Sequence, residues 1–310
     1  MGSTASGRTF GDRIAEAVEA RQSQIVLGLD PDPAHLWPGS HDAAPAGGPP
    51  AERAALAVAA HCVAVIDAVG PAVVAIKPQL ACFERLGAPG RMALGVAVDA
   101  AHDAGLLVLA DGKRGDIDVS ATAYAQSLVG STPTPFGEVQ GLGADAITAS
   151  PYMGVDTIRS LLQLARPAGA GVFVLVRTSN PGAADVEDLR LADGGALWER
   201  VARLVADVGS EGVGARGLSD VGAVVGATAP EHVARMRELM PDAVFLLPGV
   251  GAQGGRVEDL APAWLPGPAA GLVTASRSIV QASERGAGGR AQDAARTEAE
   301  RLRKVAWALA

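Results

Sequence analysis

Aspartate and lysine residues alternate in the segment from Asp111 to Asp116 (Asp-Gly-Lys-Arg-Gly-Asp), which directly follows an apolar run. If the extended backbone continues past Asp111, Lys113 points the same way as Asp111, and Asp116 follows after a glycine turn. An ammonium group held between carboxylates stays protonated. Such a lysine suits a general acid that gives a proton to carbon, whereas a Schiff-base lysine has to lose its proton first. The alternative interpretation is an ion-paired turn at the surface, because such pairs are common.

A second cluster, the glycine-rich segment 248–255 (Pro-Gly-Val-Gly-Ala-Gln-Gly-Gly), indicates an anion site. Glycines allow backbone N–H groups to come close to an anion, and the start of a following helix adds a favourable dipole. Arg277 follows the next apolar run and can hold the same anion with two hydrogen bonds. The alternative for the glycines alone is a tight loop. A dinucleotide fingerprint is not favoured, since no G-x-G-x-x-G follows the first apolar run, which ends at Asp30.

Short apolar runs separated by segments of helical spacing must position these residues. The runs are apolar continuously, which is typical of parallel strands covered on both faces. They predict eight strands at residues 25–29, 72–76, 106–110, 144–148, 171–176, 222–225, 243–247 and 271–274. Helical spacing predicts helices at residues 51–69, 158–165, 196–208 and 231–239. The alternation predicts one (β/α)₈ TIM barrel over residues 1–310, with a doubly wound open sheet as the alternative.

Polar residues follow most of the predicted strands, where a (β/α)₈ barrel carries its functional groups. These residues are Asp30, Lys77, Asp111, Ser150, Thr178, Ser179 and Arg277. Two further segments, residues 37–50 and 131–140, are rich in proline or glycine and are predicted to be surface loops. Residues 289–310 have helical spacing and predict a closing helix.

Composition excludes several other classes of protein. The chain has 310 residues with 26 basic and 34 acidic side chains, and only three of the basic residues are lysines, Lys77, Lys113 and Lys304. This acidic balance argues against a nucleic-acid or anionic-membrane binder. No secretory signal or long uninterrupted apolar span is evident, and Cys62 and Cys82 are expected to be free thiols of a cytoplasmic protein. No histidine stands at a metal-ligand spacing, so we expect no metal site.

The segment from Asp111 to Ile117 resembles the D-x-K-x-x-D-I signature of the orotidine 5′-phosphate decarboxylase family. The matching motifs span nearly the whole chain and occur in the same order as in the family. Their residues are similar to those of the longer bacterial branch of the family. Its other matches are Leu27 to Asp30, Lys77 to Gln79, Thr178 to Gly182, the glycine-rich segment 248–255, and Arg277.

The resemblance implies a homodimeric barrel that converts orotidine monophosphate to uridine monophosphate and CO₂ in pyrimidine biosynthesis, with no metal and no organic cofactor. By position, Lys113 protonates the carbon that loses CO₂, and Asp111 lies against the substrate carboxylate. Asp116 reaches in from the partner subunit and completes a charged array with Lys77.

The resemblance also implies which residues bind the substrate. Asp30 and Lys77 contact the ribose hydroxyls, and Ser179 hydrogen-bonds the base. The phosphate is held by Gln253 and Arg277. Ser120 matches a position where the family often has threonine, and Ser276 replaces a glycine that commonly precedes the arginine.

Two other functions stay open at this stage. A magnesium-dependent sugar-phosphate decarboxylase or lyase shares the barrel and the D-x-K-x-x-D pattern. That group has an acidic metal ligand where this chain has Lys77, and a cation there repels Mg²⁺. The second alternative is a non-catalytic protein that binds a nucleotide phosphate, although a buried array of charges without catalytic use costs desolvation energy.

Overall fold

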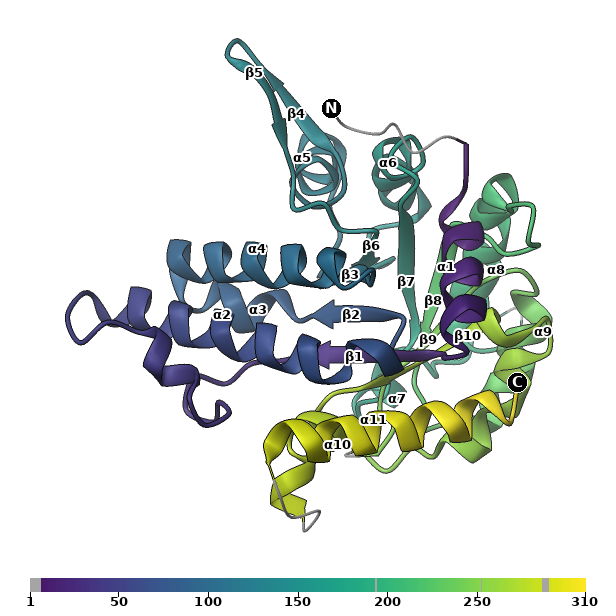
Figure 1. Ribbon diagram of the computed structural model, residues 1–310. Helices are drawn as coiled ribbons and strands as arrows, with labels where there is room; N and C mark the ends of the chain where they lie inside the picture. Colours follow the sequence, from purple (N-terminus) through teal and green to yellow (C-terminus); the bar gives the residue numbers. More distant parts are fainter. Residues whose placement is uncertain (1–6, 193, 252, 286–289) are drawn as a thin grey trace.

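The computed structural model describes residues 7–192, 194–251, 253–285 and 290–310. Eight parallel strands close into a barrel in the order β1-β10-β9-β8-β7-β6-β3-β2, with helices packed around it (Figure 1). The strands are β1 (Ile25–Leu29), β2 (Ala75–Pro78), β3 (Leu107–Arg114), β6 (Ala146–Ala149), β7 (Gly171–Arg177), β8 (Val221–Val225), β9 (Phe245–Leu247) and β10 (Gly271–Ala275). The predicted TIM barrel is confirmed, and the open sheet is excluded by the pairing of β1 with β10.

The helices surround the barrel in the expected alternation with the strands. They are α2 (Pro50–Val69), α3 (Leu80–Glu84), α4 (Gly87–Asp103), α5 (Asp118–Leu128), α6 (Val155–Ala165), α7 (Ala183–Val186), α8 (Leu197–Gly209), α9 (Val233–Leu239), α10 (Arg277–Val280) and α11 (Ala291–Trp307). The predicted closing helix is therefore present as α11, which packs against α2. The stretch Pro50–Ala72 is long and apolar enough to cross a membrane, but 61% of its most apolar window is buried in the protein. Its apolar character is that of a core helix.

An additional helix, α1 (Phe10–Arg21), which the sequence analysis did not predict, covers the N-terminal end of the barrel. Thr9 caps it by accepting a hydrogen bond from the backbone N–H of Asp12 at 3.2 Å. Phe10 is buried edge-on against Phe173 of β7, with ring centroids 5.7 Å apart. A side chain at Gly171 would collide with the ring of Phe10, so glycine is required there.

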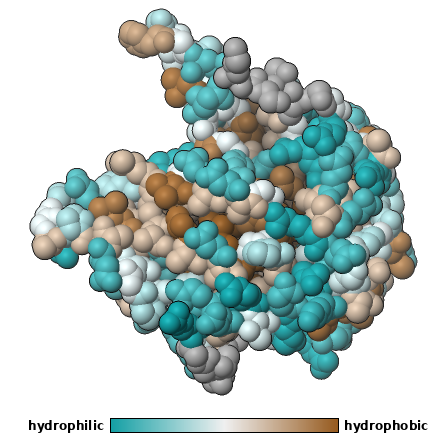
Figure 2. All heavy atoms as spheres, viewed as in Figure 1, coloured by the Kyte–Doolittle hydropathy of each residue, from teal (hydrophilic) through white to brown (hydrophobic). Residues whose placement is uncertain are grey.

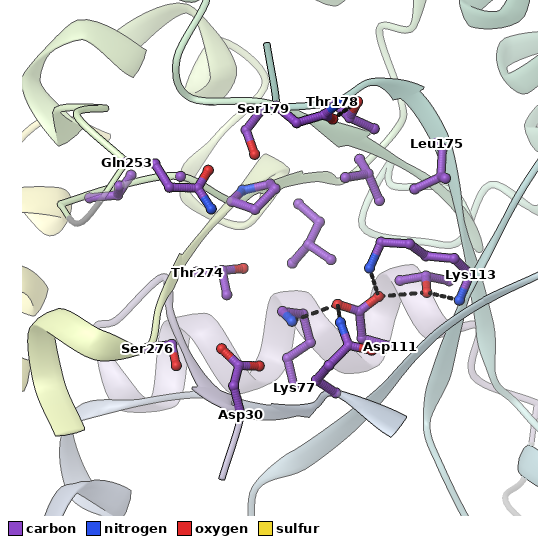
Figure 3. Close-up of a pocket in the computed structure, with 18 of the residues that line it drawn as sticks. Asp30, Lys77, Asp111, Lys113, Leu175, Thr178, Ser179, Gln253, Thr274 and Ser276 are labelled. Atoms are coloured by element: carbon purple, nitrogen blue, oxygen red, sulfur yellow. Dashed lines mark hydrogen bonds and ion pairs between the residues drawn. The ribbon is translucent and has the colours of Figure 1, made fainter. Parts of the chain in front are cut away.

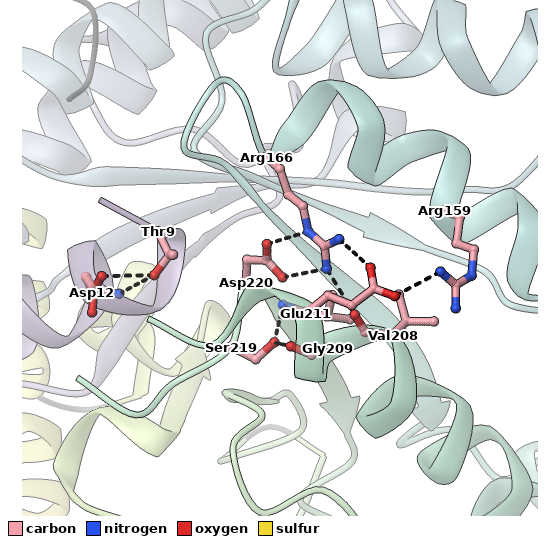
Figure 4. A network of polar contacts seen from close by, with 10 residues as sticks. Thr9, Asp12, Arg159, Arg166, Val208, Gly209, Glu211, Ser219 and Asp220 are labelled. Atoms are coloured by element: carbon pink, nitrogen blue, oxygen red, sulfur yellow. Dashed lines mark hydrogen bonds and ion pairs between the residues drawn. The ribbon is translucent and has the colours of Figure 1, made fainter. Parts of the chain in front are cut away.

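A polar network ties the outer helices to the same end of the barrel (Figure 4). The guanidinium of Arg166 donates to the buried Asp220 at 2.8 Å and to Glu211 at 2.9 Å. Glu211 also accepts a hydrogen bond from Arg159 at 3.1 Å. In this fold the N-terminal end serves stability, while function lies at the opposite end.

Residues 131–140 were predicted to form a surface loop, and this prediction is wrong in part. They form an antiparallel hairpin of β4 (Ser131–Thr134) and β5 (Gly137–Gln140), which projects away from the barrel (Figure 1). Each strand has only four residues and one contains a proline, so the segment lacks the long alternating pattern from which a hairpin is recognised.

Residues 37–50 lie at the surface as predicted, but they are not a free loop. A short 3₁₀ helix, Ser40–Ala43, packs on α2. Trp37, the first residue of the segment, is only 5% exposed. The predicted loop is therefore anchored to the barrel at its start.

Candidate active site

A cavity of about 530 Å³ opens at the C-terminal ends of the barrel strands (Figure 3). It is lined by nine of the polar residues singled out in the sequence: Asp30, Lys77, Asp111, Lys113, Thr178, Ser179, Gln253, Ser276 and Arg277. Leu175, Val224 and Leu246 add an apolar wall. Residues at the ends of all eight strands thus converge on one chamber, as the barrel topology requires.

Asp111 is the centre of the charged array. Lys77 Nζ lies 2.7 Å from its Oδ2, and Lys113 Nζ lies 2.6 Å from its Oδ1. Gln79 donates to Oδ2 at 3.1 Å, and the Thr148 hydroxyl donates to Oδ1 at 2.9 Å. Both carboxylate oxygens therefore accept two hydrogen bonds each, and the carboxylate has little rotational freedom.

The charge state of Asp111 follows from this geometry. Burial would raise the pKa of its carboxyl group, but the ammonium groups of Lys77 and Lys113 outweigh burial and lower the pKa to about 2. Asp111 is 5% and Lys77 is 7% exposed, so these charges are held in a nearly dry place. The array is fixed before any ligand binds.

The backbone conformation that brings Lys113 to Asp111 differs from the one expected from the sequence. The extended backbone does not continue past Asp111, because β3 contains a bulge between Ala110 and Arg114. Lys113 has a positive φ of 48°, and its backbone N–H donates to the Thr148 hydroxyl at 2.9 Å. The bulge turns the lysine side chain back over Asp111.

Thr148 and Gln79 are site residues to which the sequence analysis gave no role. Thr148 is the penultimate residue of β6, whereas the sequence analysis singled out Ser150, just after the strand. Ser150 is not among the described residues that line the cavity, and its N–H instead donates to the carbonyl of Arg114. The inward-facing threonine of an otherwise apolar strand was the available signal.

Gln253 lies on the side of the cavity opposite the Asp111 array (Figure 3), and Arg277 also lines the cavity. Gly249 and Gly251 of the glycine-rich segment have φ values of 102° and 78°, which favour glycine. Ser276, which precedes Arg277, packs against Gly28 of β1, where a Cβ would come within 2.7 Å of the serine Cβ. The serine is thus accommodated because the facing residue is glycine. Ala252 of the same segment lies outside the described residues.

The loop after β7 is held by Glu187, another lining residue that the sequence analysis did not identify. Its carboxylate accepts from the backbone N–H of Thr178 at 2.8 Å and from the Thr178 hydroxyl at 3.0 Å. The carbonyl of Ser179 accepts from the Thr228 hydroxyl at 3.1 Å. These bonds present the Ser179 side chain to the cavity (Figure 3).

Two of the predicted site residues lie outside the cavity of this chain. Asp116 and Ser120 are not among the described residues that line the cavity. Asp116 is partly buried and accepts from the N–H of Ile117 at 2.8 Å, whereas Ser120 is exposed on α5.

Comparison with known proteins agrees with this arrangement. The family model described as "Orotidine 5′-phosphate decarboxylase / HUMPS family" matches residues 23–291. The chain is 39% identical to an orotidine 5′-phosphate decarboxylase of Rhodopirellula baltica over 89% of this chain and 90% of that protein. It is 41% identical to one of Haloarcula marismortui, over 89% and 88% of the two chains.

A solved structure extends the similarity to the fold. The OMP decarboxylase of Leishmania donovani superposes with a TM-score of 0.70 at 31% identity, covering 96% of this chain and 98% of that one. The Lys77–Asp111–Lys113 array and Gln253 line the same cavity. The chain that carries them matches these proteins over nearly its whole length. The chain therefore belongs to the orotidine 5′-phosphate decarboxylase family.

Proposed function

We propose that this chain decarboxylates orotidine 5′-monophosphate to uridine 5′-monophosphate. The observation that carries the proposal is the fixed Lys77–Asp111–Lys113 array, which lines a cavity of about 530 Å³. Gln253 and Arg277 line the same cavity, and we call these two residues the anion clamp because we propose that they bind the phosphate. The relatives with this name support the choice of substrate. A nucleoside monophosphate has an anionic group at each end and a flat base between them, which matches the two charged sides and the apolar wall.

Lys113 is proposed to carry the chemical step. The bond between C6 of the pyrimidine and its carboxylate breaks, CO₂ leaves, and the bonding electron pair stays on C6. The ammonium group of Lys113 stabilises that charge as it develops and then gives C6 a proton. Its side chain is 44% exposed towards the cavity while Nζ is held by Asp111, so the proton donor is both accessible and positioned.

Asp111 and Lys77 are proposed to prepare the site. The low pKa of Asp111 keeps it ionised beside the substrate carboxylate, and repulsion between the two carboxylates is relieved when CO₂ leaves. Lys77 donates a hydrogen bond to Asp111 and, with Asp30, is proposed to contact the ribose hydroxyls. Both residues line the cavity, and Asp30 lies between Lys77 and Ser276 (Figure 3).

The remaining contacts are proposed from the positions of the lining residues. Ser179 points into the cavity (Figure 3) and is proposed to hydrogen-bond the base. Gln253 and Arg277 hold the phosphate, which provides binding energy far from the reacting carbon. Ser120 lies outside this cavity, so its proposed contact with substrate has no support from the single chain.

Two competing functions are less well supported. In a magnesium-dependent sugar-phosphate enzyme, an acidic ligand would stand where Lys77 lies, and the Lys77 ammonium group is already 2.7 Å from Asp111. A non-catalytic phosphate-binding protein would not need a buried lysine and aspartate pair at the far side of the cavity from the anion clamp. The position of Lys77 and its buried ion pair with Asp111 therefore both favour the decarboxylase.

The homodimer is also a proposal, with Asp116 contributed across the interface. Asp116 lies outside the cavity of its own chain, and exposed apolar side chains follow it on the same segment, with Ile117 51% and Val119 82% exposed. Further apolar surface gathers over α4 (Figure 2), where Met92 is 75% exposed. Such a surface suits a second copy of the chain.

Free Cys62 and Cys82 accord with the proposed location in the cytoplasm.

The function is tested by following the loss of orotidine monophosphate absorbance with EDTA present. We expect turnover by the wild-type chain in EDTA, no turnover by Lys113→Ala, and retained uridine monophosphate binding by that folded variant. Turnover of a sugar phosphate that needs added Mg²⁺, without turnover of orotidine monophosphate, would support the sugar-phosphate enzyme. Nucleotide binding without any turnover would support the non-catalytic protein. Wild-type turnover by a folded Lys113→Ala chain would contradict the assigned mechanism.

A further inference from the structure

Trp37 is buried, although most of the segment to which it belongs, residues 37–50, is exposed. Its indole Nε1–H donates to the carbonyl oxygen of Val280 at 2.8 Å. Its backbone N–H donates to Nδ1 of His61 on α2 at 3.1 Å, and the two rings meet edge-on with centroids 5.6 Å apart. Trp37 therefore joins α2 to the end of α10.

The helix that receives this hydrogen bond is a single turn beginning with Arg277. α10 comprises four residues, Arg277–Val280, and its last carbonyl is the one that Trp37 holds. The backbone N–H groups of Ile279 and Val280 donate to the carbonyl of Ser276 at 3.0 and 2.9 Å. Because so short a helix has little stability of its own, a bond at its last residue fixes the direction in which its first residue points.

His61 on α2 is suited to accept the hydrogen bond from the backbone N–H of Trp37. His61 is 3% exposed, and burial lowers the pKa of its imidazole to about 4. The ring is therefore neutral near pH 7 and keeps a lone pair on Nδ1 for the N–H of Trp37. His61, Arg277 and Val280 also line one small cavity of about 70 Å³, so the histidine of α2 and both ends of α10 face the same space.

We propose that Trp37 is a positioning residue for Arg277, which it orients towards the phosphate through Val280. This inference rests on the proposed function, in which Arg277 binds the substrate phosphate. Trp37 itself touches neither substrate nor the reacting atoms. Its contribution is to preorganise the clamp, so its loss weakens binding of the phosphate and leaves the array around Asp111 intact.

Trp264 provides a matched control in the same chain. It is 4% exposed, and its indole Nε1–H donates to the carbonyl oxygen of Gly271 at 2.9 Å. This bond lies at the first residue of β10, at the end of the strand away from the cavity. Trp264→Phe therefore removes the same kind of buried hydrogen bond as Trp37→Phe without touching the clamp.

The test compares competitive inhibition by uridine monophosphate and by uridine, which lacks the phosphate, in wild-type, Trp37→Phe and Trp264→Phe chains. We expect Trp37→Phe to raise the inhibition constant of the nucleotide about tenfold, the effect of one lost hydrogen bond. The constant for uridine should stay unchanged in both variants, and kcat for orotidine monophosphate should fall less than KM rises. Both variants should lose similar thermal stability.

A double-mutant cycle with Arg277→Ala separates positioning from general packing. If Trp37 acts through Arg277, Trp37→Phe has no further effect on nucleotide affinity once the arginine is gone. Additive effects, or equal losses for nucleotide and nucleoside, would overturn the inference. If Trp37→Phe does not fold, His61→Phe removes the acceptor for the Trp37 N–H, and the same readouts apply. Failure of the wild-type chain to decarboxylate orotidine monophosphate would overturn the proposed function instead.

Discussion

The ammonium nitrogen of Lys113 lies 2.6 Å from Oδ1 of Asp111, although only one residue separates them and the backbone of Lys113 is left-handed. In a regular strand the two side chains would point the same way but stand side by side. The bulge after Ala110 instead folds the lysine back over the carboxylate. The pair therefore depends on the local structure of β3, where an interruption of the regular strand pairing brings an ammonium group and a carboxylate together.

Replacing Lys113 by arginine should abolish the chemical step while the fold is kept. A guanidinium group retains the positive charge but does not readily release a proton, and its planar shape does not fit a site built for a compact ammonium group. We expect kcat to fall by about 1,000-fold or more, in line with the loss of a general acid. Initial rates at saturating orotidine monophosphate measure this effect. Lys304→Arg, on the exposed face of α11, is the matched control and should keep full activity.

Mixing two inactive variants should restore activity if Asp116 acts across a dimer interface. Lys113→Ala and Asp116→Asn chains, refolded or co-expressed together, form heterodimers in which one of the two sites contains both native residues. Random pairing in a symmetric dimer gives about a quarter of the wild-type number of intact sites. The measurement is the specific activity of the mixture against each variant alone. An inactive mixture that contains heterodimers would show that Asp116 does not act in the partner's site.

The barrel itself was predictable because continuous apolar runs leave parallel strands as the simplest interpretation. The sites at Asp30, Lys77 and Arg277 followed, since strand ends meet at one face of a barrel. The bulge at Lys113 was not predictable, because it depends on the pairing of β3 with β6 and on the hydroxyl of Thr148. The same holds for the burial of Trp37, which depends on a contact with Val280, 243 positions away.

Alanine at Gly249 should weaken phosphate binding more than it weakens the fold. The φ of Gly249 is 102°, and a Cβ would approach Gln253 Oε1 within 3.1 Å and Ser179 Cβ within 3.2 Å. We expect KM for orotidine monophosphate to rise about tenfold, because a misplaced clamp loses binding energy. Gly267→Ala is the control, since Gly267 also has a positive φ of 138° but nothing within 4 Å of the added Cβ. That variant should lose stability while KM stays unchanged.

The contribution of His102 to stability should decrease as the pH rises. A hydrogen bond to Asp145 raises the pKa of His102, although burial of the ring opposes the shift, and the charge of Asp99 adds to it. Because the folded-state pKa is raised, the protonated ring contributes fully below its ordinary value of 6.5 and the contribution is lost above the raised value. Urea unfolding of wild-type and His102→Gln chains at about pH 5.5 and about pH 9 measures the change.

The outcome is read from the difference in midpoint between the two chains. We expect a larger difference at the acidic pH, where His102 carries its proton beside Asp145, than at the basic pH. Arg13 also binds Asp145, and this ion pair is present in both chains, so it does not contribute to the difference between them. Equal differences at the two values would show that His102 acts through packing alone.

The pairing of Ile25 with Val273 and of Leu27 with Ala275 closes the barrel, and it has a consequence for how the chain folds. During synthesis β1 leaves the ribosome long before its neighbour β10 exists, so one of its edges waits unpaired until almost the whole chain has been made. Such late, long-range closure slows folding and leaves an open strand edge that pairs readily with other chains. A chain interrupted before β10 would therefore be a strong candidate for aggregation, even with every residue of the Asp111 array in place.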